Sequence, residues 1–235
     1  MGMKSSSQSY RAHKKRVFEL LKRPDLDKAL EEMSWIPEQK VINPLFSFIH
    51  HGDERIKWAA VRTMGTLVSR LAERDMEAAR VVMRRLMWNL NDESGGIGWG
   101  SPEAMGEILS RHDGLAKEYA HILLSYARRD GNYLEHEMLQ RGMLWGLGRL
   151  AEARPHLLKD ASFHLLPFLE SADAALRGLS AWVMGLLGAE ESRSALKRLT
   201  ADDAELYVAL GSHLQKRTVR EFAAEALARF SPESS

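Results

Sequence analysis

Cysteine is absent from the 235 residues of this chain. A disulfide framework and thiolate chemistry are therefore excluded, and zinc would have only histidine and carboxylate ligands. No apolar run approaches the ~20 residues that a membrane span needs. The polar stretch 1–10 also lacks the apolar core of a signal peptide. We therefore expect a cytoplasmic protein with no membrane partner.

Strong charge of either sign is also lacking, because the formal net charge is +1. Nothing global draws such a chain toward DNA or a membrane surface. A hydrophobic content of 45% and a charged content of 28% are ordinary for a soluble globular protein. The length suits one sizeable domain or a short array of repeats.

A small residue recurs at intervals of roughly 40 residues, near the period of helix-pair repeats. These five anchors are Gly65, Gly106, Gly148, Gly185 and Ala228. Apolar residues stand nine positions before, one before and two after each anchor. At about 100° per residue, these positions share one helix face. Each anchor segment is thus predicted to be an amphipathic helix, and its small anchor lets a neighbouring helix approach.

A second helical segment precedes each anchor helix, so the unit is a pair of helices. The five preceding segments are 44–50, 79–90, 116–129, 158–170 and 192–199. We expect a disordered tail over 1–9, capping helices at 11–22 and 25–33, and a break at 35–37. The predicted organisation is a cap over 1–40, one repeat domain over 41–230 and a tail over 231–235.

Three stretches share an apolar–basic pair, then small residues, then an apolar–glycine pair or its near equivalent. They are Asp53–Gly65, Leu176–Gly185 and Val219–Ala228. They resemble HEAT-like repeats of the variant first described in phycobilin lyases, over roughly 42–230. The resemblance implies an all-α fold, an α-α superhelix of about five helix pairs. Repeats 2 and 3 depart from the pattern, since Gly98 and Gln140 replace the basic residue.

The last repeat carries two local signals. Thr218 and Glu221 form a capping box, which predicts a helix start at Thr218. Ahead of it, residues 205–216 alternate apolar and polar positions around Gly211. This pattern favours a small β-hairpin inserted in the repeat. A continuing helix is the alternative.

Four of the six tryptophans fall on the helix face opposite the core stripe, seven or three residues before an anchor. Tryptophan is enriched at binding hot spots, which predicts a concave groove for a ligand or partner. The alternative is that neighbouring segments bury these rings. The predicted groove side chains are Trp58, Arg62, Trp99, Glu103, Arg141, Trp145 and Trp182. We expect Glu103 and Arg141 to pair at its centre, flanked by Trp99 and Trp145.

Residues 92–103 put four glycines, a proline and several acids into one short segment. Ser101 suits a helix N-cap, so the second helix of repeat 2 should start late, after a glycine-rich loop that carries Trp99. Asp92 and Glu93 argue against a free phosphate site there. A purely structural loop is the alternative.

Glu135, His136 and Glu137 precede the anchor helix of repeat 3. With Asp92 and Glu93 they have the chemistry of a hard metal site. They equally suit a helix N-terminus, where acids are favoured. Deoxyhypusine hydroxylases, also HEAT-like, hold iron with His-Glu pairs, and no such pair stands at the corresponding positions here. We predict no metal and no cofactor.

The leading functional hypothesis is a non-enzymatic module that captures a peptide or protein segment in the groove. The alternative is an enzyme or small-molecule binder that uses the 92–103 loop with Glu135, His136 and Glu137. Clustered acids plus one histidine can do acid–base work, but no nucleophile–base pair is identifiable. Nucleic-acid binding ranks third. HEAT-like DNA glycosylases also use groove tryptophans, but their motifs do not align and the net charge suits phosphates poorly.

Overall fold

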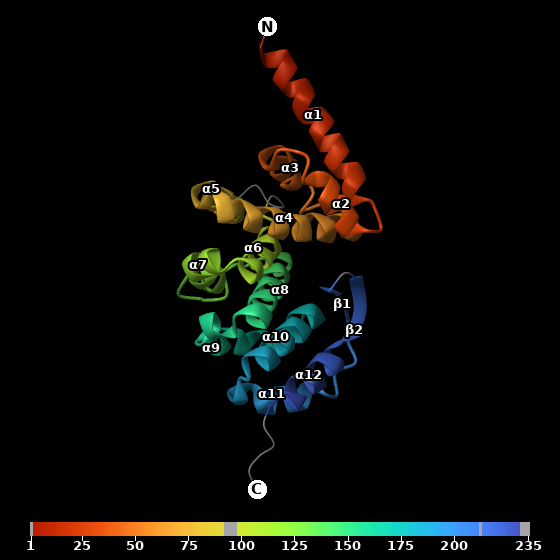
Figure 1. Cartoon of the computed structure of the whole chain (residues 1–235). Helices are drawn as coiled ribbons and strands as arrows, with labels where there is room; N and C mark the ends of the chain where they lie inside the picture. Colours follow the sequence, from red (N-terminus) through yellow and green to blue (C-terminus); the bar gives the residue numbers. More distant parts are fainter. Residues whose placement is uncertain (1, 92–97, 212, 231–235) are drawn as a thin grey trace. The chain divides into compact units, whose positions relative to one another are not determined.

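A computed structural model of the chain describes the backbone of residues 2–91, 98–211 and 213–230, and side chains from Tyr10 onward. These described residues contain twelve α-helices, three short 3-10 helices (η1–η3) and one two-stranded sheet (Figure 1). The all-α class and the small hairpin are thereby confirmed. The chain forms two compact units, Met1–Arg111 and His112–Ser235. The single repeat domain over 41–230 stays a prediction.

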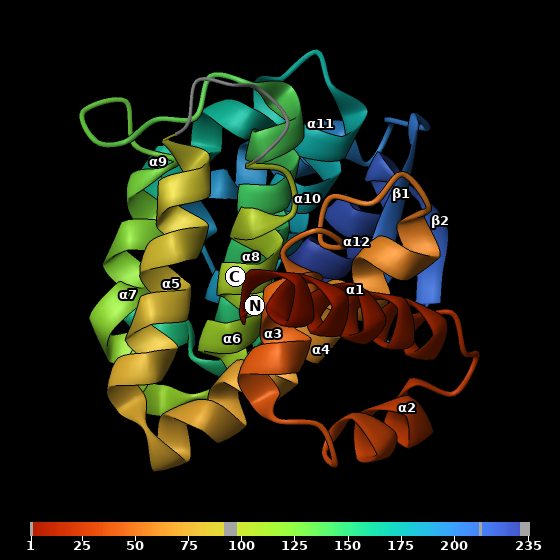
Figure 2. The same cartoon turned by 90° about the horizontal axis from the view of Figure 1, so that it is seen from above.

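The first unit contains six helices. They are α1 (Gly2–Leu21), α2 (Leu26–Met33), α3 (Glu38–Leu45), α4 (Glu54–Arg74), α5 (Met76–Leu90) and α6 (Ser101–Arg111). Helix α1 packs against α2, α3 and α4 (Figure 2). Two expectations were wrong here. The backbone is already helical from Gly2, and the segment 44–50 is the end of α3 followed by turns rather than a helix.

The second unit begins with α7 (Asp113–Ser125) and α8 (Glu137–Ala153). The chain continues through η1 (Pro155–Leu158), α9 (Ala161–Leu165), η2 (Leu166–Glu170), α10 (Ala174–Leu187), η3 (Glu190–Ser192) and α11 (Arg193–Leu199). The hairpin β1 (Glu205–Leu210) and β2 (His213–Thr218) follows, and α12 (Val219–Ala228) ends the unit. The predicted helix over 158–170 is divided into three short turns, where Pro167 interrupts a continuous α-helical ladder.

Helix starts follow capping chemistry. The side chains of Asp53 and Asp173 accept hydrogen bonds from the first backbone N–H groups of α4 and α10. Thr218 and Glu221 form the predicted capping box at the start of α12. The predicted helix start at Thr218 is therefore correct to within about a residue.

The small anchors bring successive anchor helices together. A Cβ added at Gly65 of α4 would overlap the side chain of Glu107 on α6. A Cβ at Gly148 of α8 would overlap the ring of Trp182 on α10. At Gly185 of α10 the Cβ would lie 2.6 Å from the Cα of Ala226 on α12. The predicted role of these anchors, close approach of the next helix, is confirmed at these three positions.

The hairpin packs on α10 and lies beside α10 and α12 in the second unit (Figure 1). Leu206 and Val208 on β1 are buried, while the intervening Tyr207 is 67% exposed. Leu206 sits over Gly178 of α10, with its methyl groups 3.0 Å from where a Cβ would stand. The insertion therefore covers a face of the anchor helices that the sequence pattern left open.

Candidate functional site

Trp58 and Arg62 stand one turn apart on α4, and both are half-buried. The indole N–H of Trp58 donates to Glu54 Oε2 over 2.8 Å, and Lys57 Nζ lies 4.8 Å from the ring centroid. Arg62 makes no ion pair with any residue the structure describes. Helix α4 thus presents a tryptophan and a charged guanidinium side by side.

A buried ion pair joins α4 to α6 beside these groups. Lys57 Nζ lies 3.2 Å from Glu103 Oε1, and the two side chains are 12% and 5% exposed. Burial alone would lower the pKa of Lys57, but Glu103 and Glu54 together raise it above its ordinary value of 10.5. Glu103 therefore serves to hold a cation at the interface between two anchor helices.

Trp99 lies two residues before α6 and is 40% exposed, while its neighbours Gly98 and Gly100 are buried. Gly100 has a φ of +80°, and a Cβ there would overlap the carbonyl oxygen of Ile49. The predicted late start of the repeat 2 helix is confirmed, because α6 begins at Ser101. Asp92 and Glu93 lie outside the described residues.

Ser101 is not the N-cap of α6. The amide of Ala104 donates to the carbonyl of Gly100, so Ser101 already lies within the first helical turn. Its hydroxyl is buried and has no hydrogen-bond partner among the described residues. The cap prediction failed because the left-handed glycine ends the loop one residue earlier than a serine cap would.

Glu103 and Arg141 fall in different units, so their predicted pairing stays a prediction, and each has an ion-pair partner within its own unit. Arg141 on α8 binds Asp173, with 3.0 Å between Arg141 Nε and Asp173 Oδ2. Asp173 also caps α10 through the amide of Leu176. Burial would raise the pKa of the Asp173 carboxyl, but the Arg141 hydrogen bond lowers it below its ordinary range. Arg141 therefore fastens one anchor helix to the start of the next.

Trp145 and Trp182 are core residues, so their predicted exposure was wrong. They are 5% and 8% exposed. The Trp145 indole N–H donates to the carbonyl of Ala209 on β1 over 2.8 Å, so the hairpin covers it. Trp182 fills the space left by the missing side chain of Gly148. These anchor helices are packed on several sides, so the face opposite the core stripe is also covered at Trp145 and Trp182.

Glu135, His136 and Glu137 are exposed at the start of α8. His136 is the N-cap of this helix, and its Nδ1 accepts a hydrogen bond from the Met138 amide over 3.2 Å. Within the ranges that the structure describes, no group of three histidine or acidic side chains is arranged to hold a metal ion. His136 thus caps the helix and Glu137 lies in its first turn, which is the alternative role to a metal site.

Gln140 explains how repeat 3 tolerates losing its basic residue. Its amide nitrogen donates to the Leu134 carbonyl over 2.7 Å and to the Tyr133 hydroxyl over 3.1 Å. Arg177, at the equivalent position of repeat 4, likewise donates to the Ser171 carbonyl over 2.8 Å. Both side chains fasten the loop that precedes their helix, so the amide replaces the guanidinium here.

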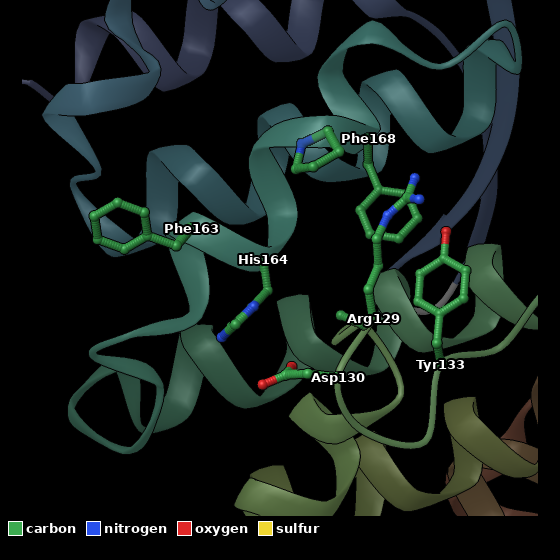
Figure 3. Close-up of a pocket in the computed structure, with 8 residues that line it drawn as sticks. Arg129, Asp130, Tyr133, Phe163, His164 and Phe168 are labelled. Carbon is green, nitrogen blue, oxygen red and sulfur yellow. The ribbon is translucent and has the colours of Figure 1, made fainter.

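A pocket that the sequence did not indicate lies in the second unit, between the loop after α7 and the α9–η2 segment (Figure 3). Its volume is about 230 Å³. The lining side chains of chemical interest are Arg129, Asp130, Tyr133, Phe163, His164 and Phe168. Phe163 and Tyr133 lie at opposite ends of the group, and His164 and Asp130 face each other. The pocket combines aromatic walls with charged groups at its mouth.

Of the charged side chains that the structure describes at this pocket, Asp130 is paired with an arginine and Arg129 is not paired with an acid. Arg128 donates two hydrogen bonds to Asp130, of 3.2 and 2.9 Å, and these hold the pKa of the Asp130 carboxyl below its ordinary range. Arg129 lies over the ring of Tyr133 at 5.6 Å from its centroid. Among the described side chains, Arg129 has no acidic partner. One cation is therefore left over at an aromatic pocket.

Comparison with known proteins bears on the fold. Residues 137–187, which include α8 and α10, match the family described as the HEAT-like repeat. Two designed armadillo repeat proteins, one solved in complex with the peptide (KR)4, are similar in structure. Both are 16% identical in sequence to this chain. Each alignment covers 93% of this chain and 99% of the designed protein, with TM-scores of 0.52 and 0.53. This likeness shows a helical repeat fold.

A curated relative is an uncharacterized protein from Archaeoglobus fulgidus, 28% identical over 121 residues. The match covers 50% of this chain and 55% of the relative, so the chain spans about half the length of that protein.

No helix in the described ranges is both long and apolar enough to cross a bilayer.

Proposed function

We propose that this chain is a non-enzymatic binding module that captures a peptide or protein segment. Helical repeat folds are typical of protein-binding scaffolds, because stacked helix pairs offer an extended surface. A structurally similar designed repeat protein carries a bound peptide. We also propose, on the residue pattern alone, that the repeats are of the phycobilin lyase type.

The contact surface that we propose comprises Trp58, Arg62 and Trp99 of the first unit, hereafter the tryptophan surface. By repeat alignment the two tryptophans occupy equivalent positions of adjacent repeats. The Lys57–Glu103 ion pair joins α4, which carries Trp58, to α6, which begins two residues after Trp99. An aromatic ring next to a guanidinium is a frequent composition of binding hot spots. Trp145, Trp182, Arg141 and Glu103 are left out, because packing and ion pairing occupy them.

The exposure of Trp99 is the main observation that supports this proposal. Trp99 stays 40% exposed although the backbone on both sides of it is buried. Gly100 fixes that backbone beneath Ile49, at a φ that most side chains avoid. A tryptophan ring that is 40% exposed on an anchored backbone offers an aromatic surface for a partner to cover.

Selection from a phage-displayed library of random peptides tests the proposal. The wild-type chain should enrich a family of related sequences, and Trp99→Ala and Arg62→Ala should lose them. Trp35→Ala is the matched control, because Trp35 lies between α2 and α3, is 88% exposed and is not part of the tryptophan surface. The proposal fails if no sequence family is enriched, or if the control loses binding as fully as Trp99→Ala.

A further inference from the structure

We infer that the pocket between the α7–α8 loop and the α9–η2 segment binds a peptide in which a large apolar side chain stands next to a carboxylate. The inference rests on the proposed function, because it takes the captured partner to be a peptide, and it adds a second site to the tryptophan surface. The site involves residues of the second unit only. Its arguments are the size of the pocket, its walls, its unbalanced charge and the way its loop is held.

The size favours one side chain over a whole small molecule. Pockets for drug-sized ligands enclose about 300–1,000 Å³. This one encloses about 230 Å³. Phe168 is only 6% exposed, whereas Phe163 is 74% exposed on the rim. A single apolar side chain entering over Phe168 would cover much of the Phe163 ring, which otherwise remains in water.

The charge favours a carboxylate beside that side chain. Asp130 is neutralised by two hydrogen bonds from Arg128, so it does not balance Arg129. Arg129 is exposed, and its contact with the Tyr133 ring leaves donors on the guanidinium. A guanidinium presents paired donors that match both oxygens of a carboxylate. The carboxylate can belong to an Asp or Glu side chain or to a chain terminus.

The loop that carries these groups is held in place before any ligand arrives. The amides of Gly131, Asn132 and Leu134 donate to the carbonyls of Arg128, Ser125 and Tyr126, over 3.0, 3.0 and 3.1 Å. The Tyr126 ring is buried, which raises the pKa of its hydroxyl to about 12. Less ordering is then required on binding, and preorganised sites bind more tightly for the same contacts.

The experiment screens two pools of random short peptides against the whole chain, one with free and one with amidated C-termini. We expect enrichment of peptides with a large apolar residue adjacent to a carboxylate. Enrichment in both pools identifies an acidic side chain as the source, and enrichment in the free pool alone identifies the terminus. For a peptide so selected, Phe163→Ala and Arg129→Ala should each weaken binding by about tenfold or more. Arg129→Glu should shift the preference toward lysine-containing peptides.

Arg55→Ala and Trp35→Ala are the controls, because Arg55 and Trp35 are highly exposed and belong to the first unit. Both should leave the affinity unchanged. The inference is overturned if the selected peptides lack a carboxylate, or if their affinity is indifferent to Arg129 and Phe163. Loss of binding in Trp99→Ala with no effect in the pocket variants would overturn this inference alone. The reverse pattern would overturn the tryptophan surface alone, and no enrichment by the wild type would overturn both.

Discussion

At the scale of the residue, Gly100 is the described glycine that would tolerate an added side chain least. Its φ of +80° disfavours any Cβ, and an added methyl would also meet the Ile49 carbonyl. We expect Gly100→Ala to cost more than the roughly 1–3 kcal/mol of a strained backbone conformation. Gly188→Ala is the control, because Gly188 has a φ of +63° with open space around it. Urea unfolding of both variants measures the difference; equal losses would contradict the predicted overlap.

Trp145 provides a second test at this scale. The ring is 5% exposed and its N–H is bonded to the hairpin. We therefore expect Trp145→Ala to lower the free energy of unfolding by about 3–5 kcal/mol. Trp35→Ala, at an 88% exposed ring, should change it little. If thermal unfolding shows the two variants to be alike, Trp145 is not in the core.

At the scale of the element, α10 carries two glycines with different neighbours. A Cβ at Gly185 would lie 2.6 Å from the α12 backbone at Ala226, which cannot move without separating the helices. A Cβ at Gly178 would lie 3.0 Å from the end of the Leu206 side chain, which can rotate. Alanine favours a helix by about 1 kcal/mol over glycine. Gly185→Ala should destabilise the second unit, and Gly178→Ala should be near neutral in chemical denaturation. A stable Gly185→Ala variant would rule out the close contact.

The Lys57–Glu103 pair makes a prediction about the junction of α4 and α6. Lys57→Met leaves Glu103 buried without a partner, and this costs about 3–5 kcal/mol. Replacing both, with Lys57→Met and Glu103→Gln, should recover most of that loss. If the double variant is no more stable than Lys57→Met, the two side chains are not coupled.

The same pair has a signature in pH. The folded-state pKa of Lys57 is raised above its ordinary value of 10.5. Its contribution to stability is therefore fully present below that value and is lost as the pH rises through the folded-state pKa. Denaturation measured into the alkaline range should show a steeper decline for the wild type than for the double variant. Parallel pH profiles would contradict this.

Element by element, the local chemistry of the chain predicts the five anchor helices but not the turns over 46–50 or the broken segment over 158–170. Capping residues such as Asp53, Asp173 and Thr218 define helix starts because they act over three or four positions. The hairpin was also predicted, from alternation around Gly211. Its docking was not, because the bond from Trp145 to Ala209 joins residues 64 positions apart. Local periodicity gives a helix its faces, but only tertiary packing decides which of them are covered.

At the scale of the whole molecule, the sequence predicts the repeat fold and part of the candidate site. Trp58, Arg62 and Trp99 remain at a surface, whereas Trp145 and Trp182 are packed inside the second unit. The pocket around Arg129 was missed for a physical reason. It combines a loop of one repeat with the first segment of the next, and neither shares the anchor pattern. In the sequence, an arginine near Tyr133 in a loop does not indicate a pocket. The pocket exists only because the fold places Phe163 and Phe168 beside these residues.

The central claim is that a peptide is bound through side chains that the fold leaves exposed. The most direct measurement is a calorimetric titration of one library-selected peptide into the wild type, Trp99→Ala and Trp35→Ala. We predict that Trp99→Ala weakens binding by about tenfold or more while keeping nearly the wild-type melting temperature, and that Trp35→Ala binds normally. Unchanged affinity in Trp99→Ala, or a fall in its melting temperature as large as that of Trp145→Ala, would contradict the claim.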